Sequence, residues 1–347
     1  MKKLTHLLLP LGITVGLCLN IAPVSAASLQ VQKVIPDSAL SIDGFGSTSN
    51  SGFIQAKIPK GSTIEQAYLY ATSIWDMSPM SPVSGVIFHG TTLPVSSATI
   101  LSPNQNPATT VRWDVTSIID SSSSPTGIFP TDFSIIEEGD NDGAVLVVAY
   151  SNRSTQGLTS VILDGELNTK GDTVKFDFPA PYAGGNFLVS LASSYSRQPS
   201  FQYTQIDVTT NSTTNRRLTT SAGGQDDGDS MDPGALITVG GIGDNPANPG
   251  PFTQPDNDSS NPGPRTDDEY YNLALGNSAN SAPFIQRGDT FVEFTTVNYT
   301  DDDNVFGMFI NSKFGTSPSP VPEPSMTLGI FGIGGIGILL SRLGKKS

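Results

Sequence analysis

Residues 142–150 read DGAVLVVAY, and this stretch decides the fold class. From Ala144 to Ala149 the run is apolar without interruption, which is the pattern of a strand covered on both of its faces. The Asp142-Gly143 pair in front of it supplies turn chemistry, because glycine tolerates positive φ. We therefore expect a central β-strand here, with other strands arranged around it.

Two other stretches alternate instead of running apolar throughout. Val111, Trp113 and Val115 alternate with polar residues between 109 and 118, and two tyrosines alternate with small apolar residues between 64 and 72. The alternation at 109–118, the clearer of the two, predicts a sheet with one buried face. Further candidate strands cover residues 52–58, 83–89, 158–163, 172–178, 187–192, 201–208, 235–239, 290–297 and 305–311.

No stretch shows a sustained helical period, and Gly, Pro, Asn and Ser separate the short strands. This organisation predicts an all-β fold, an antiparallel β-sandwich or jelly roll, rather than an α/β fold. We expect the body to span residues 27–314. A division of this body into two lobes, 27–155 and 156–314, is one interpretation of the sequence.

The first 26 residues have the organisation of a secretory signal peptide. Lys2 and Lys3 precede the apolar segment Leu7–Leu19, and Val24-Ser25-Ala26 supplies small residues at the positions that signal peptidase reads. We predict cleavage after Ala26. Cys18 lies inside the apolar segment, so it is interpreted as part of the signal and not as a lipoprotein cysteine.

The last 27 residues have three parts in a fixed order. The turn Pro322-Glu323-Pro324 comes first, then an apolar, glycine-rich run from Met326 to Leu340, and then a basic end. The prolines keep the backbone extended and open to a processing enzyme. As a helix and with Ser325 included, the run reaches about 24 Å, a short span against a hydrocarbon core of about 30 Å. The basic end favours the cytoplasmic side of a membrane.

This tail, residues 321–347, resembles the PEP-CTERM sorting signal. The resemblance implies an exported protein of a Gram-negative envelope that is held transiently in the inner membrane by a single helix. An exosortase would then cleave it near Pro322-Glu323-Pro324, behind a Pro-rich spacer at 315–324, and release it to the cell surface or the extracellular space. Proteins of this class are linked to exopolysaccharide and biofilm matrix. An ordinary single-pass anchor is the alternative.

A second resemblance covers about residues 50–165. The order of the alternating strand at 67–70, the segment 86–90, the segment 112–116 and the central strand at 142–150 is similar to an exported β-sandwich domain of unknown function. That domain is found on bacterial and archaeal surfaces. The resemblance implies a fold and a location, and no chemistry.

The charge and the cysteine content exclude several classes of function. Without Lys2, Lys3, Arg342, Lys345, Lys346 and Glu323, the formal net charge moves from −14 to −18. Such a surface repels nucleic acid and favours divalent cations or simple solvation. The body has no cysteine, so it contains neither disulfides nor a Cys-His catalytic pair.

Catalytic motifs are absent from the sequence. There is no Gly-x-Ser-x-Gly elbow, His-Glu-x-x-His helix or phosphate-binding loop, and the only histidine of the body, His89, lies beside Gly90 as turn histidines do. Paired carboxylates for a glycoside hydrolase would have to come from Glu137, Glu138, Glu166, Glu269 and Glu293. We expect no catalysis.

Calcium is the better site hypothesis, because four acidic loops are dense in oxygen ligands. The favoured set is Asp226, Asp227 and Asp229, with Gly228 allowing a sharp turn. None of the loops has the spacing of an EF-hand. The alternative is that these loops are solvated and keep the protein soluble.

The sequence thus predicts a non-enzymatic surface or matrix protein, with signal peptidase and exosortase as partners and exopolysaccharide as a further candidate partner. The second hypothesis is a calcium-dependent carbohydrate-binding module that uses exposed Tyr182, Tyr270 or Tyr271. A polysaccharide-active hydrolase is the third.

Overall fold

The structure is a computed structural model. It describes residues 29–46, 49–73, 83–101, 109–122, 130–139, 141–168, 170–178, 180–194, 204–222, 237–248, 269–298 and 304–313. Within these ranges the chain forms 19 β-strands, one α-helix and two short 3₁₀-helices, and every strand pairing is antiparallel. The predicted all-β antiparallel class is therefore confirmed.

The strands form four sheets, which we number I to IV. Sheet I has the order β3 (Ser51–Ala56), β9 (Thr131–Glu137), β5 (Val86–Phe88), β6 (Thr91–Leu93). Sheet II has the order β2 (Ser38–Phe45), β10 (Asn141–Ser151), β4 (Thr63–Ser73), β8 (Thr110–Asp114), β7 (Thr99–Ile100). The helices are α1 (Thr116–Ser122), η1 (Val95–Ser97) and η2 (Arg153–Thr155).

Sheets III and IV come mainly from the second half of the chain. Sheet III has the order β1 (Gln30–Pro36), β11 (Thr159–Asp164), β19 (Asn304–Ser312), β13 (Phe187–Ser194), β16 (Ile237–Val239), and β17 (Tyr270–Asn272) also pairs with β13. Sheet IV has the order β12 (Thr173–Asp177), β18 (Phe291–Asn298), β14 (Thr204–Thr210), β15 (Arg216–Ala222).

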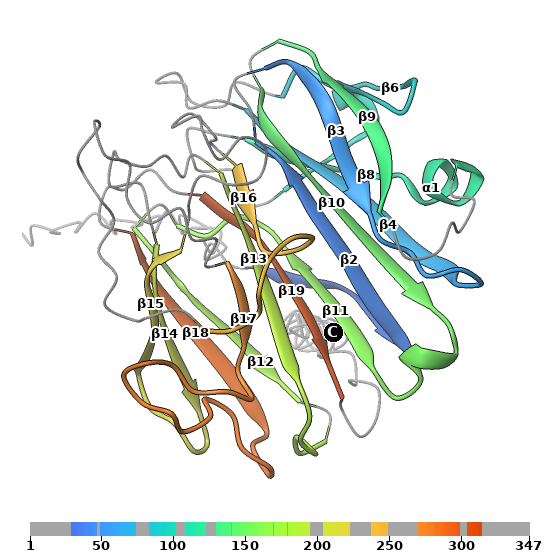
Figure 1. The fold of residues 1–347 in the computed structure, drawn as a ribbon. Coiled ribbons are helices and arrows are strands. Elements are labelled where there is room, and N and C mark those ends of the chain that lie inside the picture. The colour runs from blue at the N-terminus through green and yellow to red at the C-terminus, as the bar shows by residue number, and fades with distance from the viewer. Residues whose placement is uncertain are drawn as a thin grey trace, which may run out of the picture.

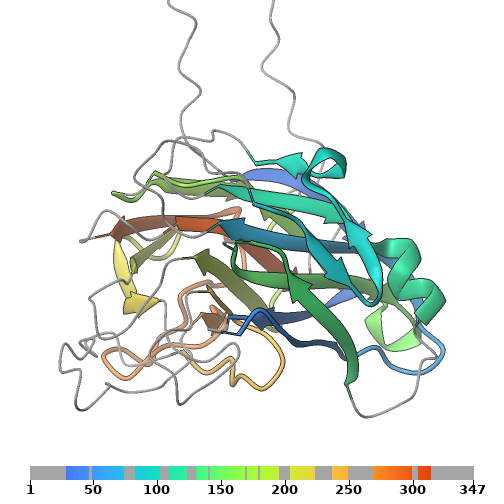
Figure 2. The same cartoon turned by 90° about the horizontal axis from the view of Figure 1, so that it is seen from above.

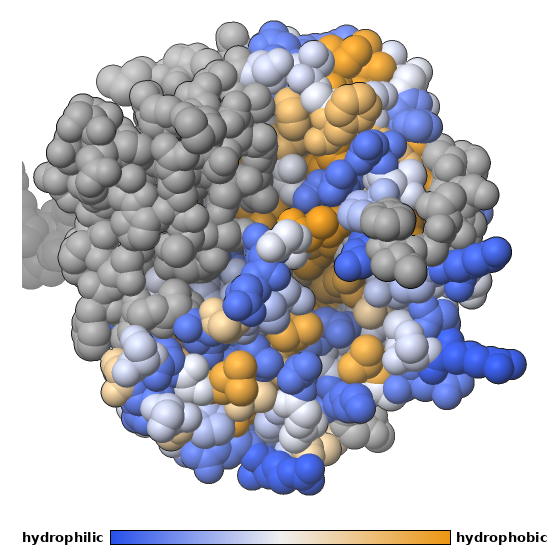
Figure 3. Space-filling view, viewed as in Figure 1, coloured by the Kyte–Doolittle hydropathy of each residue, from blue (hydrophilic) through white to orange (hydrophobic). Residues whose placement is uncertain are grey.

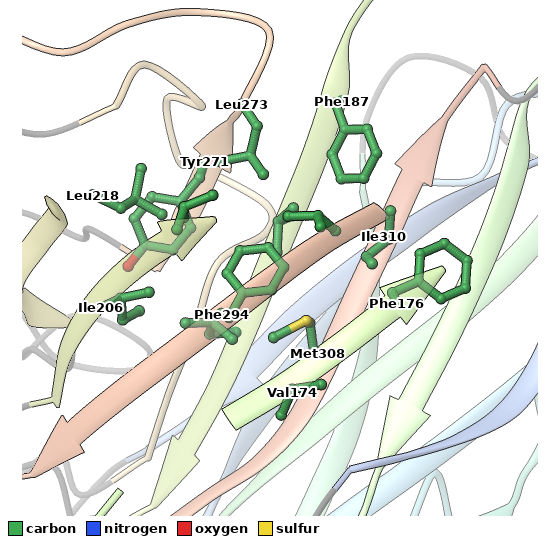
Figure 4. Packing of buried hydrophobic residues seen from close by; sticks show 14 of the residues in the cluster. Val174, Phe176, Phe187, Ile206, Leu218, Tyr271, Leu273, Phe294, Met308 and Ile310 are labelled. Atoms are coloured by element: carbon green, nitrogen blue, oxygen red, sulfur yellow. The ribbon is translucent and has the colours of Figure 1, made fainter. Parts of the chain in front are cut away.

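Three apolar cores stack these sheets in the order I, II, III, IV. The first core lies between sheets I and II and includes Trp113 and Phe133. The second lies between sheets III and IV, where Phe294 of β18 packs near Met308 of β19 (Figure 4). The third core joins the two pairs, because it combines residues of sheets II and III. Figure 1 shows sheets I and II on the right and sheets III and IV on the left.

Strand β10 explains why both faces of sheet II are covered. Ala144, Leu146 and Val148 belong to the first core, whereas Val145 and Val147 belong to the third. All five side chains are fully buried. Since successive side chains of a strand point to opposite faces, an unbroken apolar run is what a strand between two cores requires. The prediction of a central, doubly covered strand is confirmed.

Strand β4 is buried on both faces, although its sequence alternates. Its small residues, such as Leu69, pack into the first core as the alternation indicates. Tyr68 and Tyr70, on the other face, are buried in the third core and not in solvent. Tyrosine tolerates either environment, since its ring is apolar and its hydroxyl polar. The period of two therefore identified the strand without revealing its second contact.

A buried polar cluster closes the third core between sheets II and III. Arg112 of β8 and the hydroxyl of Tyr70, the latter at 2.8 Å, both donate to Oδ2 of Asp164 at the end of β11. The Arg112 guanidinium also lies 4.7 Å from the ring centre of Tyr68. Burial raises the pKa of Asp164, while Arg112 and Tyr70 act in the opposite direction. The cluster thus holds a charge where solvent is excluded.

The expected strand at 109–118 ends earlier than predicted. Strand β8 stops at Asp114, and α1 begins at Thr116. Asp114 Oδ1 accepts hydrogen bonds from the backbone N–H and the hydroxyl of Thr116, at 3.0 and 2.6 Å, and so turns the chain. Figures 1 and 2 show α1 at one side of the molecule, far from sheet IV. Strands β1, β2, β6, β7, β9, β15 and β17 were not predicted.

The first strand belongs with the second half of the chain. Strand β1 pairs with β11 in sheet III, whereas β2, which follows after Asp37, pairs with β10 in sheet II. Asp37 has a φ of 52°, and its side chain accepts from the N–H of Gly157 at 2.7 Å. The N-terminal segment therefore links both sheet pairs. The expected division into lobes 27–155 and 156–314 stays a prediction.

The predicted signal peptide at 1–26, the spacer at 315–324 and the sorting helix lie outside the described residues. In the part of the chain that the structure describes, no helix has the length and hydropathy needed to cross a membrane.

We predict that Arg112→Ala destabilises the protein by about 3 to 5 kcal/mol, because it leaves the Asp164 carboxylate buried without its cation. Denaturant unfolding measures the change. The matched control is Lys175→Ala, which removes the exposed Lys175–Asp177 pair, with side chains 46% and 68% exposed, and should cost at most about 1 kcal/mol. Equal effects of the two substitutions would contradict this assignment.

Candidate functional site

A cleft opens where the edge of sheet II meets sheet III. It has a volume of about 420 Å³ and is lined from β2 by residues 39–42, from sheet III by Leu188, Tyr270, Phe309 and Asn311, and by the segment 241–244. Tyr150, Lys57 and Pro59 complete it. Figure 3 shows a hollow over β2 with hydrophobic atoms at its floor. Clefts of about 300 to 1,000 Å³ with a mainly apolar lining are usual for small ligands.

Two glycines create one wall of the cleft. Gly240 and Gly241 follow β16 and pass between β17 and β2, and the next residue, Ile242, donates its N–H to the carbonyl of Ile42 at 2.9 Å. A Cβ atom at Gly241 would lie 2.1 Å from that carbonyl oxygen, and one at Gly240 would lie 2.6 Å from the nitrogen of Tyr270. Only glycine permits this close approach, and of the two glycines Gly241 lines the cleft.

Asp244 is the last residue of this wall and is its only charged side chain among residues 241–244. One of its carboxylate oxygens accepts from the N–H of Gly241, which shapes the turn. Burial, the nearby Asp244 charge and Tyr150 raise the pKa of Tyr270 to about 12, and burial raises the pKa of Tyr150. Both phenols are therefore neutral hydrogen-bond donors at physiological pH.

Asp43 of β2 lies beside the cleft and titrates near neutrality. Burial raises its pKa to about 7, the charge of Asp244 adds to the rise, and the N–H of Gln55, 2.5 Å from Oδ2, opposes it. Two carboxylates in a partly desolvated place repel each other, so the proton on one of them is held more tightly. The region next to the cleft thus changes charge around pH 7.

Asn311 and Ser41 supply the remaining polar atoms. The Asn311 amide donates to the carbonyl of Ser38 and to Oγ of Ser160, both at 3.0 Å, which holds its side chain in one orientation. Ser41 Oγ accepts from the N–H of Lys57 at 2.8 Å. The polar rim is therefore held by bonds within the protein.

The predicted calcium ligands cannot be placed. Asp226, Asp227 and Asp229 lie outside the described residues, as do the processing residues Ala26, Pro322, Glu323 and Pro324. Among the side chains that the structure does describe, no group of three or more Asp, Glu, His or Cys is arranged to hold a metal ion. The calcium site stays a prediction from sequence.

The three tyrosines named for carbohydrate contact have different positions. Tyr270 lines the cleft, which agrees with a contact role. Tyr182 and Tyr271 are buried, at 3% and 0% exposure, so the prediction that they are exposed is wrong. Both belong to the core between sheets III and IV, because β17 and the loop before β13 fold inward there.

The residues considered for catalysis are separated from the cleft. His89, at a φ of 46°, is exposed in the two-residue turn between β5 and β6. Glu137, Glu138, Glu166, Glu269 and Glu293 all lie in the described part of the chain, and none of them lines the cleft. Glu166 accepts from the backbone N–H of Thr110 at 2.9 Å. The sequence did not identify Tyr150, Asp43 or Asp244 as site residues. The one local signal was the Gly240-Gly241 pair, which marks the close approach of the loop that leads to Asp244.

Comparison with known proteins identifies the tail. The profile of the PEP-CTERM protein-sorting motif matches residues 320–345. The chain carries a PEP-CTERM sorting motif. It is thus an exosortase substrate, exported and anchored transiently in the membrane, as the sequence predicted. The PEP-CTERM motif covers the tail only. No curated protein matches the chain in sequence.

Three solved structures are similar to the chain at low levels. The major capsid protein P2 of bacteriophage PM2 is 11% identical, with a TM-score of 0.21, over 80% of this chain and 100% of its own. PNGF-II is 11% identical, with a TM-score of 0.25, over 82% and 67%. BpGH86A, a beta-porphyranase of glycoside hydrolase family 86 from Bacteroides plebeius, is 9% identical, with a TM-score of 0.21, over 86% and 38%. These scores carry no conclusion about this chain.

We predict that Asp43→Asn raises the melting temperature at pH 8 by a few degrees and changes it little at pH 4. The pKa of Asp43 is about 7 in the folded state and 3.8 in the unfolded state. The protonated carboxyl group is therefore tolerated below pH 4, and the stability of the folded state falls as the pH rises from 4 to 7 and the buried group loses its proton. Asparagine keeps an acceptor for Gln55 without the charge. The control is Asp177→Asn on the exposed side of β12, and a loss of stability at every pH in Asp43→Asn would contradict the prediction.

The calcium prediction has a direct test in the exported protein. If Asp226, Asp227 and Asp229 bind Ca²⁺, saturating calcium should raise the melting temperature. At a calcium concentration of 100 times Kd, the free energy of unfolding should rise by about 2.7 kcal/mol. Calorimetry and thermal unfolding should show this effect in the wild type and not in the triple Asp→Asn variant. Mg²⁺ at the same concentration controls for ionic strength. Absence of heat in the wild type would mean that these loops are solvated.

Proposed function

We propose that this protein is a non-catalytic, exported β-sandwich protein that the PEP-CTERM motif delivers to the surface of a Gram-negative cell, where it associates with exopolysaccharide in the biofilm matrix. The single observation that supports the proposal is the sorting motif at 320–345, attached to an all-β body. The acidic composition of that body favours solubility outside the cell and disfavours binding to nucleic acid.

The proposed route has two processing steps. Signal peptidase removes residues 1–26 after Ala26, and the apolar run from Met326 to Leu340 then holds the chain in the inner membrane. Exosortase cleaves near Pro322-Glu323-Pro324, because two prolines keep that backbone extended and free of helical hydrogen bonds. The spacer at 315–324 separates the body from the membrane during this step.

Substitution of Pro322, Glu323 and Pro324 by alanine should abolish processing in a host that has the exosortase. We expect the uncleaved form to collect in the inner-membrane fraction, measured by the mass of the chain and by fractionation. The control is Ser317→Ala with Ser319→Ala, which changes the same spacer and leaves the turn intact. Normal cleavage of the alanine variant would overturn the proposed role of the turn.

The matrix association is tested separately. Wild-type protein should be retained in the extracellular matrix of cells that make exopolysaccharide, and it should appear in the culture medium of cells that do not. Equal release from both strains would overturn the association with exopolysaccharide while leaving the sorting route intact.

Carbohydrate binding is a second candidate activity, and the cleft at the edge of sheet II is the observation that favours it. The cleft combines two tyrosines, a carboxylate and an apolar floor. Binding of a glycan by this surface needs neither the predicted calcium loops nor catalysis.

A further inference from the structure

The cleft presents two hydrogen-bond donors that the protein does not use. The hydroxyls of Tyr150 and Tyr270 have no hydrogen-bond partner among the described residues, yet both rings are only partly exposed and both line the cleft. Their raised pKa values keep them protonated. Neither hydroxyl is among the buried atoms that lack a partner, so both are open to solvent, and an acceptor on a ligand in the cleft can replace that water.

The same cleft presents acceptors close to these donors. One oxygen of Asp244 is engaged by Gly241, which leaves the other oxygen available. The Asn311 nitrogen donates to Ser38 and Ser160, so its oxygen is the atom left for a ligand. Asp244 and Tyr270 line the same cleft, and the charge of Asp244 contributes to the raised pKa of Tyr270. The cleft therefore offers both donors and acceptors, as a ligand with several hydroxyl groups requires.

Apolar side chains form the rest of the lining. Leu40, Leu188, Phe309 and Pro59 face the same space, which has a volume of about 420 Å³. The C–H faces of a sugar ring pack on such a surface, while its hydroxyls reach the polar rim. A purely aliphatic ligand would leave the phenols and the carboxylate desolvated without partners, which costs free energy. A phosphate or a uronic acid would meet the charge of Asp244, with Lys57 as the only cation among the lining residues.

We propose that this cleft is a binding site for a neutral sugar unit of a glycan, with Tyr150, Tyr270, Asp244 and Asn311 making the polar contacts. The inference rests on the proposed association with exopolysaccharide and specifies the part of the protein that makes it. Sugar binding in this cleft requires no metal ion, whereas the hypothesis of binding through the acidic loops requires calcium.

The test uses the exported, processed protein and a panel of glucose, galactose, mannose, cellobiose and lactose, with glucuronic acid as the anionic comparison. Saturation-transfer NMR detects contact and calorimetry gives Kd, both in the presence of a chelator. We expect saturable binding of at least one neutral sugar and weaker binding of glucuronic acid. Loss of one hydrogen bond in Tyr270→Phe or Tyr150→Phe should raise Kd about three- to tenfold.

Asp244→Asn is the sharper variant, because asparagine still accepts from Gly241 and so preserves the turn. It should raise Kd for neutral sugars about tenfold and reduce the discrimination against glucuronic acid. Matched controls are Tyr182→Phe and Asp177→Asn, which remove the same groups outside the cleft and should leave Kd unchanged. Far-UV circular dichroism and the melting temperature verify that each variant is folded.

Two results would overturn the inference. One is no saturable binding of any neutral sugar by the wild type, and the other is binding that none of the three cleft variants weakens, since the sugar would then occupy another surface. These results are independent of the matrix test. If the protein is sorted and retained in the matrix but binds no sugar, only the inference about the cleft is wrong. A protein that binds sugars through the cleft but is released equally by both strains defeats the proposed matrix association alone.

Discussion

The burial of sheet II on both faces is the constraint on which the rest of the structure depends. A single pair of sheets would leave Val145, Val147 and Tyr70 in water, and these residues are instead fully buried against sheet III. The stabilisation from burying large apolar side chains is about 1.5 to 3 kcal/mol for each of them, so separating the two sheet pairs would be costly. The four layers consequently form one continuous packing unit along the stack.

The polar cluster around Asp164 shows how such an interface is kept in register. Apolar contacts are not directional, whereas Asp164 must meet both Arg112 and Tyr70 for its charge to be tolerated inside. Sliding of one sheet over the other would expose the carboxylate to apolar neighbours. The bonds of Asp164 to Arg112 and Tyr70 therefore favour the one arrangement of sheets II and III in which both are made.

The sequence predicted the elements with strong patterns and missed those whose pattern depends on context. Strand β10 was identified with both of its faces, because no polar residue interrupts the run from Ala144 to Ala149. Strand β2 was missed, since its polar residues Ser41 and Asp43 accept hydrogen bonds from the backbone of the segment after it, which the sequence pattern does not reveal. Helix α1 is too short to show a period. The cleft combines residues from 39 to 311, so it exists only once sheets II and III are stacked, and Tyr270 was the one lining residue named beforehand.

The place of β19 in sheet III bears on the order of events during export. This last strand lies between β11 and β13, and it supplies Phe306 and Phe309 to one core and Met308 and Ile310 to another. Neither core can close until residue 312 has crossed the membrane, and the sorting motif follows at 320, within about 30 Å of extended chain. Folding that waits for such distant pairings is slow. On the proposed export route, the sorting motif would therefore hold the chain at the membrane while its final strand is inserted.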